Sequence, residues 1–437
     1  MGARETAFGT LAACRRQGGW SNAVLKESIR KDKLDGREAA LATRLVYGVV
    51  QNRGRLDFYL KQLLKGKLRD LHPATRDILH LGLYQIYDLD RIPDSAAVNE
   101  AVALAKKYVP QSQVGLVNGV LRSAVRTKGS LREPTSFEDK YSHPEALVSL
   151  LKANVPKGML ESILQADNAA PDTVIQVNTT KTDAESLIKL LKDQNVEATP
   201  HSWMPDCLVL SGTGNLENLP AFREGLFYVQ DPASRLSVRC AELPKAGGIR
   251  LLDCCAAPGG KSFAAAMDMG GRGTVLSRDV HPHKIALIEN GAKRLGLTNI
   301  QAGVQDAAQF VPEWQEAMDV VLVDAPCSGL GIIRKKPDIR CRDLESTKEL
   351  PELQKAILWN QARYVKKGGV LMYSTCTVLK RENEEVVAAF LEAYPDFFPE
   401  KLNLPEIFPE NDTGMLTLYP GQWDTDGFFI ARLRRKL

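Results

Sequence analysis

Long apolar runs are missing from this chain of 437 residues. Hydrophobic residues make up 44% of it, but charged residues interrupt them throughout. No stretch approaches the ~18 consecutive apolar residues that a membrane-spanning helix needs. The opening residues, MGARETAFGTLAACRRQGG, also lack the charged and apolar regions of an export signal. We therefore expect a soluble, cytoplasmic protein, and its length predicts two or three domains.

Cysteine pairs of the C-x-x-C type are absent too. The eight cysteines are Cys14, Cys207, Cys240, Cys254, Cys255, Cys327, Cys341 and Cys376. None is spaced with the six histidines as zinc ligands are. His281 and His283 flank a proline, which favours a solvated turn over a ligand site. We therefore expect no bound metal, and free thiols in a reducing cytoplasm.

Two nucleotide-binding fingerprints are also lacking. The stretch GGKS ends like a P-loop, but that motif needs a glycine where the chain has Cys255. A dinucleotide-type G-x-G-x-x-G is missing as well. These absences disfavour enzymes that bind ATP by a P-loop or that use NAD.

Basic charge is concentrated near the N-terminus. Residues 1–130 contain 22 Lys and Arg against 12 Asp and Glu, a net charge of +10, whereas the whole chain has +4. Such an excess favours a polyanionic partner, although a solvated helical surface is the alternative.

Helical periodicity dominates up to residue 128. Apolar residues recur at three and four positions in REAALATRLVYGVVQ, RLDFYLKQLL, ATRDILHLGLYQIYDL and AAVNEAVALAKKYV. We predict an all-α domain over residues 1–128. The first of these stretches, together with RIPDSAAVNEAVALAKKY and VGLVNGVLRSAVR, resembles the NusB-like antitermination-factor domain. This resemblance implies an RNA-binding helical bundle.

The middle of the chain changes character. Residues 129–142 are polar and aperiodic, which predicts a linker. Over residues 143–240, two short helical stretches precede strand-like segments such as TVIQVNTT and DCLVLSGTG around the helix AESLIKLLKDQN. We predict a small α+β domain there, of the RRM-like kind.

Residues 241–437 alternate apolar strands with helices. The predicted strands are IRLLDCC, GTVLSRDV, NIQAGV, MDVVLVDAP and GGVLMYSTC. Near-continuous apolar strands separated by helices predict a parallel, doubly wound Rossmann-type sheet covered on both faces. Ligands of such sheets bind at the carboxyl ends of the strands.

The first strand leads into the turn AAPGGKS, whose Gly259 and Gly260 would let the backbone approach a nucleotide-like ligand. Asp279 follows the second strand, where a carboxylate can bind a ribose diol, and Asp306 follows the third. Either carboxylate could instead cap a helix, but the glycine turn favours the ligand reading.

Two thiols stand where neighbouring strands end. Cys327 follows the strand VVLVD, and Cys376 follows GGVLMYST. Base rates favour a core role for any one cysteine, but two at the ligand edge reverse this. Such a pair suits chemistry at C5 of a pyrimidine, because a thiolate that adds to C6 makes C5 nucleophilic. A methyl donor such as S-adenosylmethionine would then supply the electrophile.

The motifs LLDCCAAPGGKS, DAPCSGLG and YSTCT resemble the RNA cytosine-C5 methyltransferases. With the NusB-like front, the chain resembles their Sun/Fmu (RsmB) branch, which implies a cytosine of small-subunit (16S) rRNA as target. The resemblance implies Cys376 as nucleophile, Cys327 in product release, and Asp324 in orienting the cytosine. It also implies that S-adenosylmethionine is held by Cys255, Ala256, Ala257, Pro258, Gly259, Gly260, Lys261, Asp279, Asp306 and Asp324.

Some residues depart from the family pattern. Gln176 stands where the family has arginine, and residues 143–154 lack its usual tryptophan, so RNA contacts of the middle domain are open. GLFYVQDPASRLS and DGFFIARL keep the pattern. The basic residues after the Pro-Cys loop are expected to meet phosphates around an extruded base; they are Arg334, Lys335, Lys336, Arg340 and Arg342.

Alternatives stay open at this point. A DNA cytosine methyltransferase would use the Pro-Cys thiol, Cys327, as nucleophile; the second thiol and the helical module argue against it. The target could be another RNA such as tRNA, or the chain could be a catalytically silent RNA-binding factor. We expect RNA as partner, no membrane, no metal and a monomer, with naked rRNA and a partly assembled subunit both possible.

Overall fold

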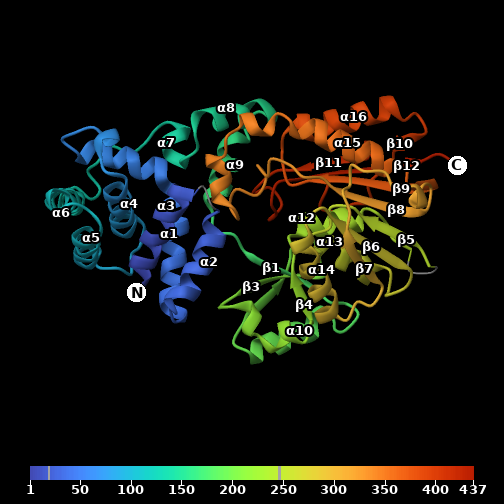
Figure 1. The fold of residues 1–437 in the computed structure, drawn as a ribbon, viewed down its shortest axis with the longest axis horizontal. Coiled ribbons are helices and arrows are strands. Elements are labelled where there is room, and N and C mark those ends of the chain that lie inside the picture. The colour runs from blue at the N-terminus through green and yellow to red at the C-terminus, as the bar shows by residue number, and fades with distance from the viewer. Residues whose placement is uncertain (18–19, 245–247) are drawn as a thin grey trace. The chain divides into compact units, whose positions relative to one another are not determined.

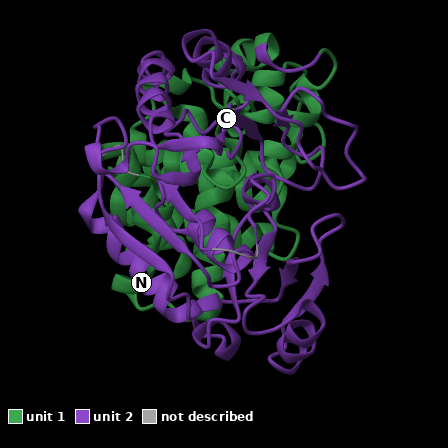
Figure 2. Ribbon diagram, turned by 90° about the vertical axis from the view of Figure 1, so that its right-hand side faces the viewer, with its two compact units in different colours: residues 1–153, 157–169, 333–342 green, residues 154–156, 170–332, 343–437 purple. Residues whose placement is uncertain are grey.

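The computed structural model describes residues 1–17, 20–244 and 248–437 (Figure 1). The contacts within the chain divide it into two compact units (Figure 2). Unit 1 comprises residues 1–153, 157–169 and 333–342, and unit 2 comprises residues 154–156, 170–332 and 343–437. Across the described residues, no helix is both long and apolar enough to span a membrane.

Unit 1 is a helical bundle, which confirms the predicted fold class of this region. Its core contains the fully buried side chains of Leu45, Val49, Leu56, Ile78 and Leu121. The helices are α1 (Ala3–Gln17), α2 (Ser21–Asp32), α3 (Gly36–Leu63), α4 (Pro73–Asp88), α5 (Asp94–Tyr108), α6 (Gln111–Arg126), α7 (Phe137–Tyr141), α8 (Glu145–Asn154) and α9 (Leu160–Asn168), with 3-10 turns η1 (Leu68–Asp70) and η4 (Pro337–Cys341).

Helix α3 joins two stretches that the sequence pattern separates, residues 37–51 and 55–64. Asp35 caps its start by accepting hydrogen bonds from two backbone N–H groups. Gly54 lies inside the helix, and a Cβ there would stand 3.0 Å from the Cα of Ser142. The glycine therefore serves a close approach of another segment and does not end the helix.

The segment expected to be a linker is partly folded. Residues 137–141 form α7, and Tyr141 is buried. Ser142 Oγ accepts a hydrogen bond from the backbone N–H of Arg55 at 2.9 Å. This segment is held in place by contacts with residues that are distant in the sequence. Its own sequence therefore shows no helical periodicity. Helices α8 and α9 also group with unit 1, and the domain boundary at residue 143 stays a prediction.

Unit 2 contains a small antiparallel sheet in the order β2-β3-β1-β4. Its elements are β1 (Thr173–Val177), α10 (Ala184–Asp193), β2 (Glu197–Pro200), β3 (Cys207–Ser211), η2 (Leu216–Asn218), α11 (Pro220–Arg223) and β4 (Phe227–Val229). Ile175, Leu187, Leu191 and Leu208 form its buried core. This confirms the small α+β layer. Strand β2 was not predicted, because Glu-Ala-Thr-Pro is largely exposed and carries no apolar run.

The large sheet of unit 2 has the order β10-β12-β9-β8-β5-β6-β7, with β11 paired to β12. Its strands are β5 (Arg250–Asp253), β6 (Thr274–Asp279), β7 (Ile300–Val304), β8 (Met318–Asp324), β9 (Val365–Thr375), β10 (Phe397–Pro399), β11 (Met415–Leu418) and β12 (Phe428–Arg435). The associated helices are α12 (Pro232–Arg239), α13 (Gly260–Asp268), α14 (Pro282–Leu295), α15 (Leu350–Ala362) and α16 (Glu384–Ala393), with 3-10 turns η3 (Pro312–Trp314), η5 (Glu345–Thr347) and η6 (Lys380–Glu382).

The large sheet is buried on both faces but is mixed, not wholly parallel. Neighbouring residues of β5 show the two faces, because Leu251 packs in the core with α13 and α14, and Leu252 in the core with α15 and α16. Strands β7, β6, β5, β8 and β9 are parallel, whereas β12 runs antiparallel to β9. The five strands predicted from the sequence are the parallel ones, whereas β12, which was not predicted, follows α16, β10 and β11 and adds an antiparallel strand beside β9.

Buried polar groups hold the small sheet together and join it to helix α14. Asn178 Nδ2 donates to the carbonyl oxygens of Gly225 and Leu295, each at 2.8 Å. Gln176, the departure from the family pattern, is buried and accepts a hydrogen bond from Cys207 Sγ at 3.3 Å. The change to glutamine therefore affects internal packing of unit 2 and not an exposed surface.

Candidate active site

The two thiols singled out in the sequence lie side by side. Cys327 follows β8 and Cys376 follows β9; these strands are parallel neighbours, with Asp324 opposite Ser374. The two sulfur atoms are 3.2 Å apart. Because the strands end at the same edge, residues 49 positions apart in sequence meet there.

Hydrogen bonds join the two loops that hold these thiols. Ser328 Oγ lies 2.7 Å from Thr377 Oγ1, and the backbone N–H of Gly331 donates to the carbonyl oxygen of Cys376 at 2.9 Å. A Cβ at Gly331 would stand 2.1 Å from the carbonyl oxygen of Gly427, so only glycine fits. The positions of both sulfurs thus depend on a tightly packed backbone.

The electrostatics of the pair distinguish the two thiols. The hydrogen bond with Cys376 and then burial raise the pKa of the Cys327 thiol well above its ordinary value. Loss of the Cys327 proton is therefore disfavoured, and either sulfur of the pair can be the hydrogen-bond donor. Cys376 lines a cavity, and the described residues that line this cavity do not include Cys327.

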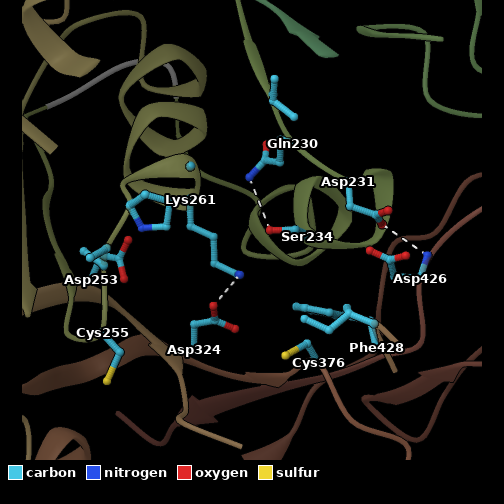
Figure 3. A pocket seen from close by; sticks show the side chains of 16 residues that line it. Gln230, Asp231, Ser234, Asp253, Cys255, Lys261, Asp324, Cys376, Asp426 and Phe428 are labelled. Atoms are coloured by element: carbon cyan, nitrogen blue, oxygen red, sulfur yellow. Dashed lines mark hydrogen bonds and ion pairs between the residues drawn. The ribbon is translucent and has the colours of Figure 1, made fainter. Parts of the chain in front are cut away.

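That cavity, of about 240 Å³, lies at the carboxyl ends of the central strands. In Figure 3 the amine of Lys261 points at Asp324, with Cys376 and Phe428 on the adjacent wall. Lys261 Nζ is 2.7 Å from one Asp324 oxygen, and Ser374 Oγ donates to the other at 2.9 Å. Asp324 is thus held rigidly beside the thiol.

The turn after β5 forms another wall of the cavity. Of its residues, Cys255, Ala256, Ala257, Pro258, Gly260 and Lys261 line the cavity, and Gly259 does not. Gly259 has a φ of 113°, which favours glycine because side chains rarely adopt it. The backbone therefore turns sharply into α13 and exposes its first turn to the cavity.

Asp279 and Asp306 lie at the same sheet edge but are not among the described residues that line this cavity. Asp279 accepts hydrogen bonds from the backbone N–H groups of Ala257 and His281 at 3.3 and 3.0 Å. Asp306 accepts one from Ala308 at 2.9 Å. These contacts hold turns and cap no helix, because the N-cap residue of α14 is His281 and Asp306 precedes a turn. The cofactor role of both carboxylates stays a prediction.

Several cavity residues were not assigned from the sequence. Asp253 is fully buried; Ser262 Oγ donates to its Oδ2 at 2.7 Å, while its Oδ1 has no hydrogen-bond partner among the described residues. Burial raises its pKa to about 7. Asp231 and Asp426 also line the cavity. The motifs LLDCC, VQDPAS and DGFF contain these three carboxylates, but nothing in them distinguishes a cavity residue from a cap.

The expectation for the basic segment was wrong in one important respect. Residues 333–342 belong to unit 1, and Arg340 is only 2% exposed there. Its guanidinium donates to the carbonyl oxygen of Gln51 at 2.7 Å and to those of Asp167 and Ser142 at 3.3 and 3.4 Å. Arg340 is therefore a structural residue that cannot reach a phosphate, whereas Lys336 is exposed.

Comparisons with known proteins give the family. A model described as 16S rRNA methyltransferase RsmB/F matches residues 243–434, the NusB family model matches residues 1–126, and an RsmF/B-like ferredoxin-like domain matches residues 143–217. The probable ribosomal RNA small subunit methyltransferase B of Bacillus subtilis (strain 168) is 37% identical, with 99% of this chain and 98% of that protein covered. The chain belongs to the RsmB/F family of 16S rRNA methyltransferases.

Other relatives agree. The ribosomal RNA small subunit methyltransferase B of Citrobacter koseri is 33% identical, covering 93% of each chain. The crystal structure of PH0851 has a TM-score of 0.78 and 28% identity, covering 95% of this chain and 94% of that one. NSun6 from Pyrococcus horikoshii, solved with SFG, has a TM-score of 0.59 and 22% identity over 67% of this chain and 98% of that one, and shows a shared fold. The RsmB/F resemblance read from the motifs is thus confirmed.

Proposed function

We propose that this protein transfers a methyl group from S-adenosylmethionine to C5 of a cytosine in 16S rRNA, through a covalent bond between Cys376 and C6. The observation that carries the proposal is the thiol pair. One thiol lines the cavity, and the other, whose pKa is raised, has its sulfur 3.2 Å away. Membership of the RsmB/F family supports an rRNA substrate.

The residues around the cavity fit S-adenosylmethionine. The turn from Cys255 to Lys261 offers backbone at the start of α13, and a Cβ at Gly260 would stand 3.2 Å from Gln230 Nε2. The unpaired, buried Oδ1 of Asp253 suits a cationic ligand group. We assign Cys255 to Lys261 and Asp324 to this ligand, with Asp279 and Asp306 next to them. When bound, it supplies an electrophilic methyl group.

Cys376 performs the first chemical step. Its thiolate adds to C6 of the cytosine, and the electrons of the C5–C6 double bond then make C5 nucleophilic. Asp324, held by Lys261 and Ser374, orients the base. After C5 has gained its methyl group, its proton leaves, the double bond forms again, and the C6–sulfur bond breaks. Cys327 assists by donating its hydrogen bond to the departing Cys376 sulfur.

The electrostatics also favour this assignment over the DNA-type mechanism, in which Cys327 would attack. A nucleophilic thiol needs to ionise and to face the substrate. Cys327 has a raised pKa, and the cavity lining includes Cys376 in its place. An RNA other than 16S rRNA, such as tRNA, remains an outcome of the test below, and so does a silent RNA-binding factor. We place the reaction in the cytoplasm, on naked rRNA or on a partly assembled subunit.

Bisulfite sequencing tests the proposed function. We expect one cytosine of 16S rRNA to be protected in cells that contain the protein and unprotected in cells that lack it. The purified protein with S-adenosylmethionine should restore the protection, and its Cys376→Ala variant should not. Restoration only in tRNA would change the substrate, and restoration in neither RNA would contradict the proposal.

A further inference from the structure

Close to the thiol pair lies a carboxylate that the mechanism above does not use. Glu382, in η6, is 0% exposed. Its Oε2 accepts hydrogen bonds from the backbone N–H of Ser328 at 2.8 Å and from Gln354 Nε2 at 2.9 Å. Its Oε1 is buried without a hydrogen-bond partner among the described residues. Burying a carboxylate in this way costs free energy, so a purpose is expected.

The contacts of Glu382 enclose the backbone of Cys327 from both sides. Ser328, bonded directly to Glu382, follows Cys327 in the chain. Pro326 precedes it, and the Gln354 amide that contacts Glu382 also donates to the Pro326 carbonyl oxygen at 3.0 Å. Glu382 itself follows β9 by seven residues, within the segment that begins with Cys376. One carboxylate therefore sets where Cys327 stands relative to Cys376.

The negative charge of Glu382, like its contacts, favours a protonated Cys327 beside Cys376. The groups that act electrostatically on the Cys327 thiol are Cys376, Glu382 and Asp324, and the thiol acts in turn on the phenol of Tyr373. After the hydrogen bond with Cys376 and burial, the negative charges of Cys376, Glu382 and Asp324 raise the pKa of Cys327 further. Each of them makes loss of the Cys327 proton harder.

We propose that Glu382 is a positioning residue for product release: it holds Cys327 against Cys376 and keeps it a hydrogen-bond donor to the departing sulfur. This inference rests on the proposed covalent mechanism. At release, the C5 proton passes to solvent water, its bonding electrons form the C5–C6 double bond, and the C6–sulfur electron pair stays on Cys376. Glu382 forms no bond to the substrate and acts only through Cys327.

The full-length Glu382→Gln variant tests this role, because it keeps the side-chain size and removes the charge. We expect turnover of 16S rRNA to fall by about 10- to 100-fold, as a small misplacement of a reacting group does. The KM for RNA should stay unchanged. Methylated RNA should accumulate as an adduct with Cys376 that survives denaturing electrophoresis, and the basic limb of the pH–rate profile should move to lower pH. Glu385→Gln, at an exposed position of α16, is the matched control and should behave as the unmodified protein.

The Cys327→Ala variant and the unmodified protein distinguish a failure of the role proposed for Glu382 from a failure of the proposed function. If Cys327→Ala traps an adduct while Glu382→Gln turns over normally with none, the role of Glu382 is wrong and the proposed function stands. If the unmodified protein methylates no cytosine and Cys327→Ala traps nothing, both fail. Should Glu382→Gln lose its thermal transition, Gln354→Met takes its place, since it removes the amide that joins Glu382 to the Pro326 carbonyl oxygen and keeps the direct contact between Glu382 and Ser328. Loss of folding in both variants would overturn the proposal in favour of a purely structural role.

Discussion

Helix α6 of unit 1 and the thiol-bearing edge of unit 2 use glycine in opposite ways. Gly115 and Gly119 lie exposed on α6, and a Cβ at either would meet nothing within 4 Å. Gly331 and Gly427 face each other so closely that a Cβ on Gly331 would stand 2.1 Å from the Gly427 oxygen. The comparison separates an open helix surface, which has room for a side chain, from a site whose backbone leaves none.

The largest expected effects concern the thiols themselves. Cys376→Ala removes the atom that adds to C6, so methylation should fall by about 10⁴-fold or more and no adduct should form. Cys327→Ala keeps the nucleophile and should trap methylated RNA on Cys376. Denaturing electrophoresis of labelled RNA distinguishes the two variants, with the double variant as control. An adduct in Cys376→Ala alone would support the DNA-type mechanism.

The next largest effect is expected from replacing the crowded glycine, Gly331, and not the open one, Gly115. Gly331→Ala should lower methylation by about 100-fold, because the added Cβ must displace the loop that holds Cys376. Gly115→Ala, in an open part of α6, should leave activity unchanged and should stabilise the protein by about 0.5–1 kcal/mol, since alanine loses less entropy in a helix. Thermal melting and single-turnover kinetics measure the pair. Equal activity of both variants would contradict the expected difference between the crowded Gly331 and the open Gly115.

Arg340 extends the comparison to a buried charge in unit 1. Arg340→Met should lower the free energy of unfolding by about 2 kcal/mol, because backbone carbonyls lose a charged donor. Lys336→Met, at an exposed position of the same segment, is the control and should change stability little. Urea denaturation followed by circular dichroism gives both values. A phosphate-binding role for Arg340 would instead appear as weaker RNA binding at unchanged stability.

Asp253 predicts a pH dependence in unit 2. Its folded-state pKa of about 7 lies above the ordinary value of 3.8, so the stability of the neutral form is fully present below pH 3.8 and is lost as pH rises through 7. Asp253→Asn should therefore be more stable than the unmodified protein at pH 8, with a flatter stability profile between pH 4 and 7. Thermal melts across this range measure the difference. If the stability of both proteins changed with pH in the same way, a group other than Asp253 would be responsible for the pH dependence.

The smallest effect is expected on the surface of unit 1. Replacing the exposed Lys65 and Lys67 by alanine should weaken rRNA binding several-fold and should reduce the salt slope by roughly 0.7–0.9 for each phosphate that is no longer neutralised. Replacing Lys189 and Lys192 on α10 changes the charge equally within unit 2 and serves as control. Filter binding at several salt concentrations tests this. Equal weakening in both double variants would mean that binding follows total charge and not unit 1.

Much of the site was readable from the sequence, because parallel strands bring their carboxyl ends to one edge. The motifs around Cys327 and Cys376 therefore lie together as predicted. Glu382 and Asp253 could not be singled out, since burial of a carboxylate depends on packing that no local pattern encodes. Arg340 was misread for a similar reason: a basic run near a site indicates phosphate contacts only if its side chains remain exposed.

Fold class followed from periodicity, and the errors arose where periodicity is weak. Strands β10 and β11 are short, and β12 joins the sheet antiparallel to β9 through contacts that are distant in sequence. Helix α7 has five residues, too few to show a helical period. In each case the order comes from partners supplied by the rest of the chain.

The position of β12 also has a consequence for biosynthesis. Strand β9 is made about 50 residues before β12, which covers its free edge and whose first residue, Phe428, lines the cavity. On the ribosome, β9 must therefore wait with an unpaired, apolar edge, the kind of surface on which nascent chains aggregate. The helices of unit 1 emerge first and can fold early, whereas a complete cavity exists only after residues 426–435 have been translated.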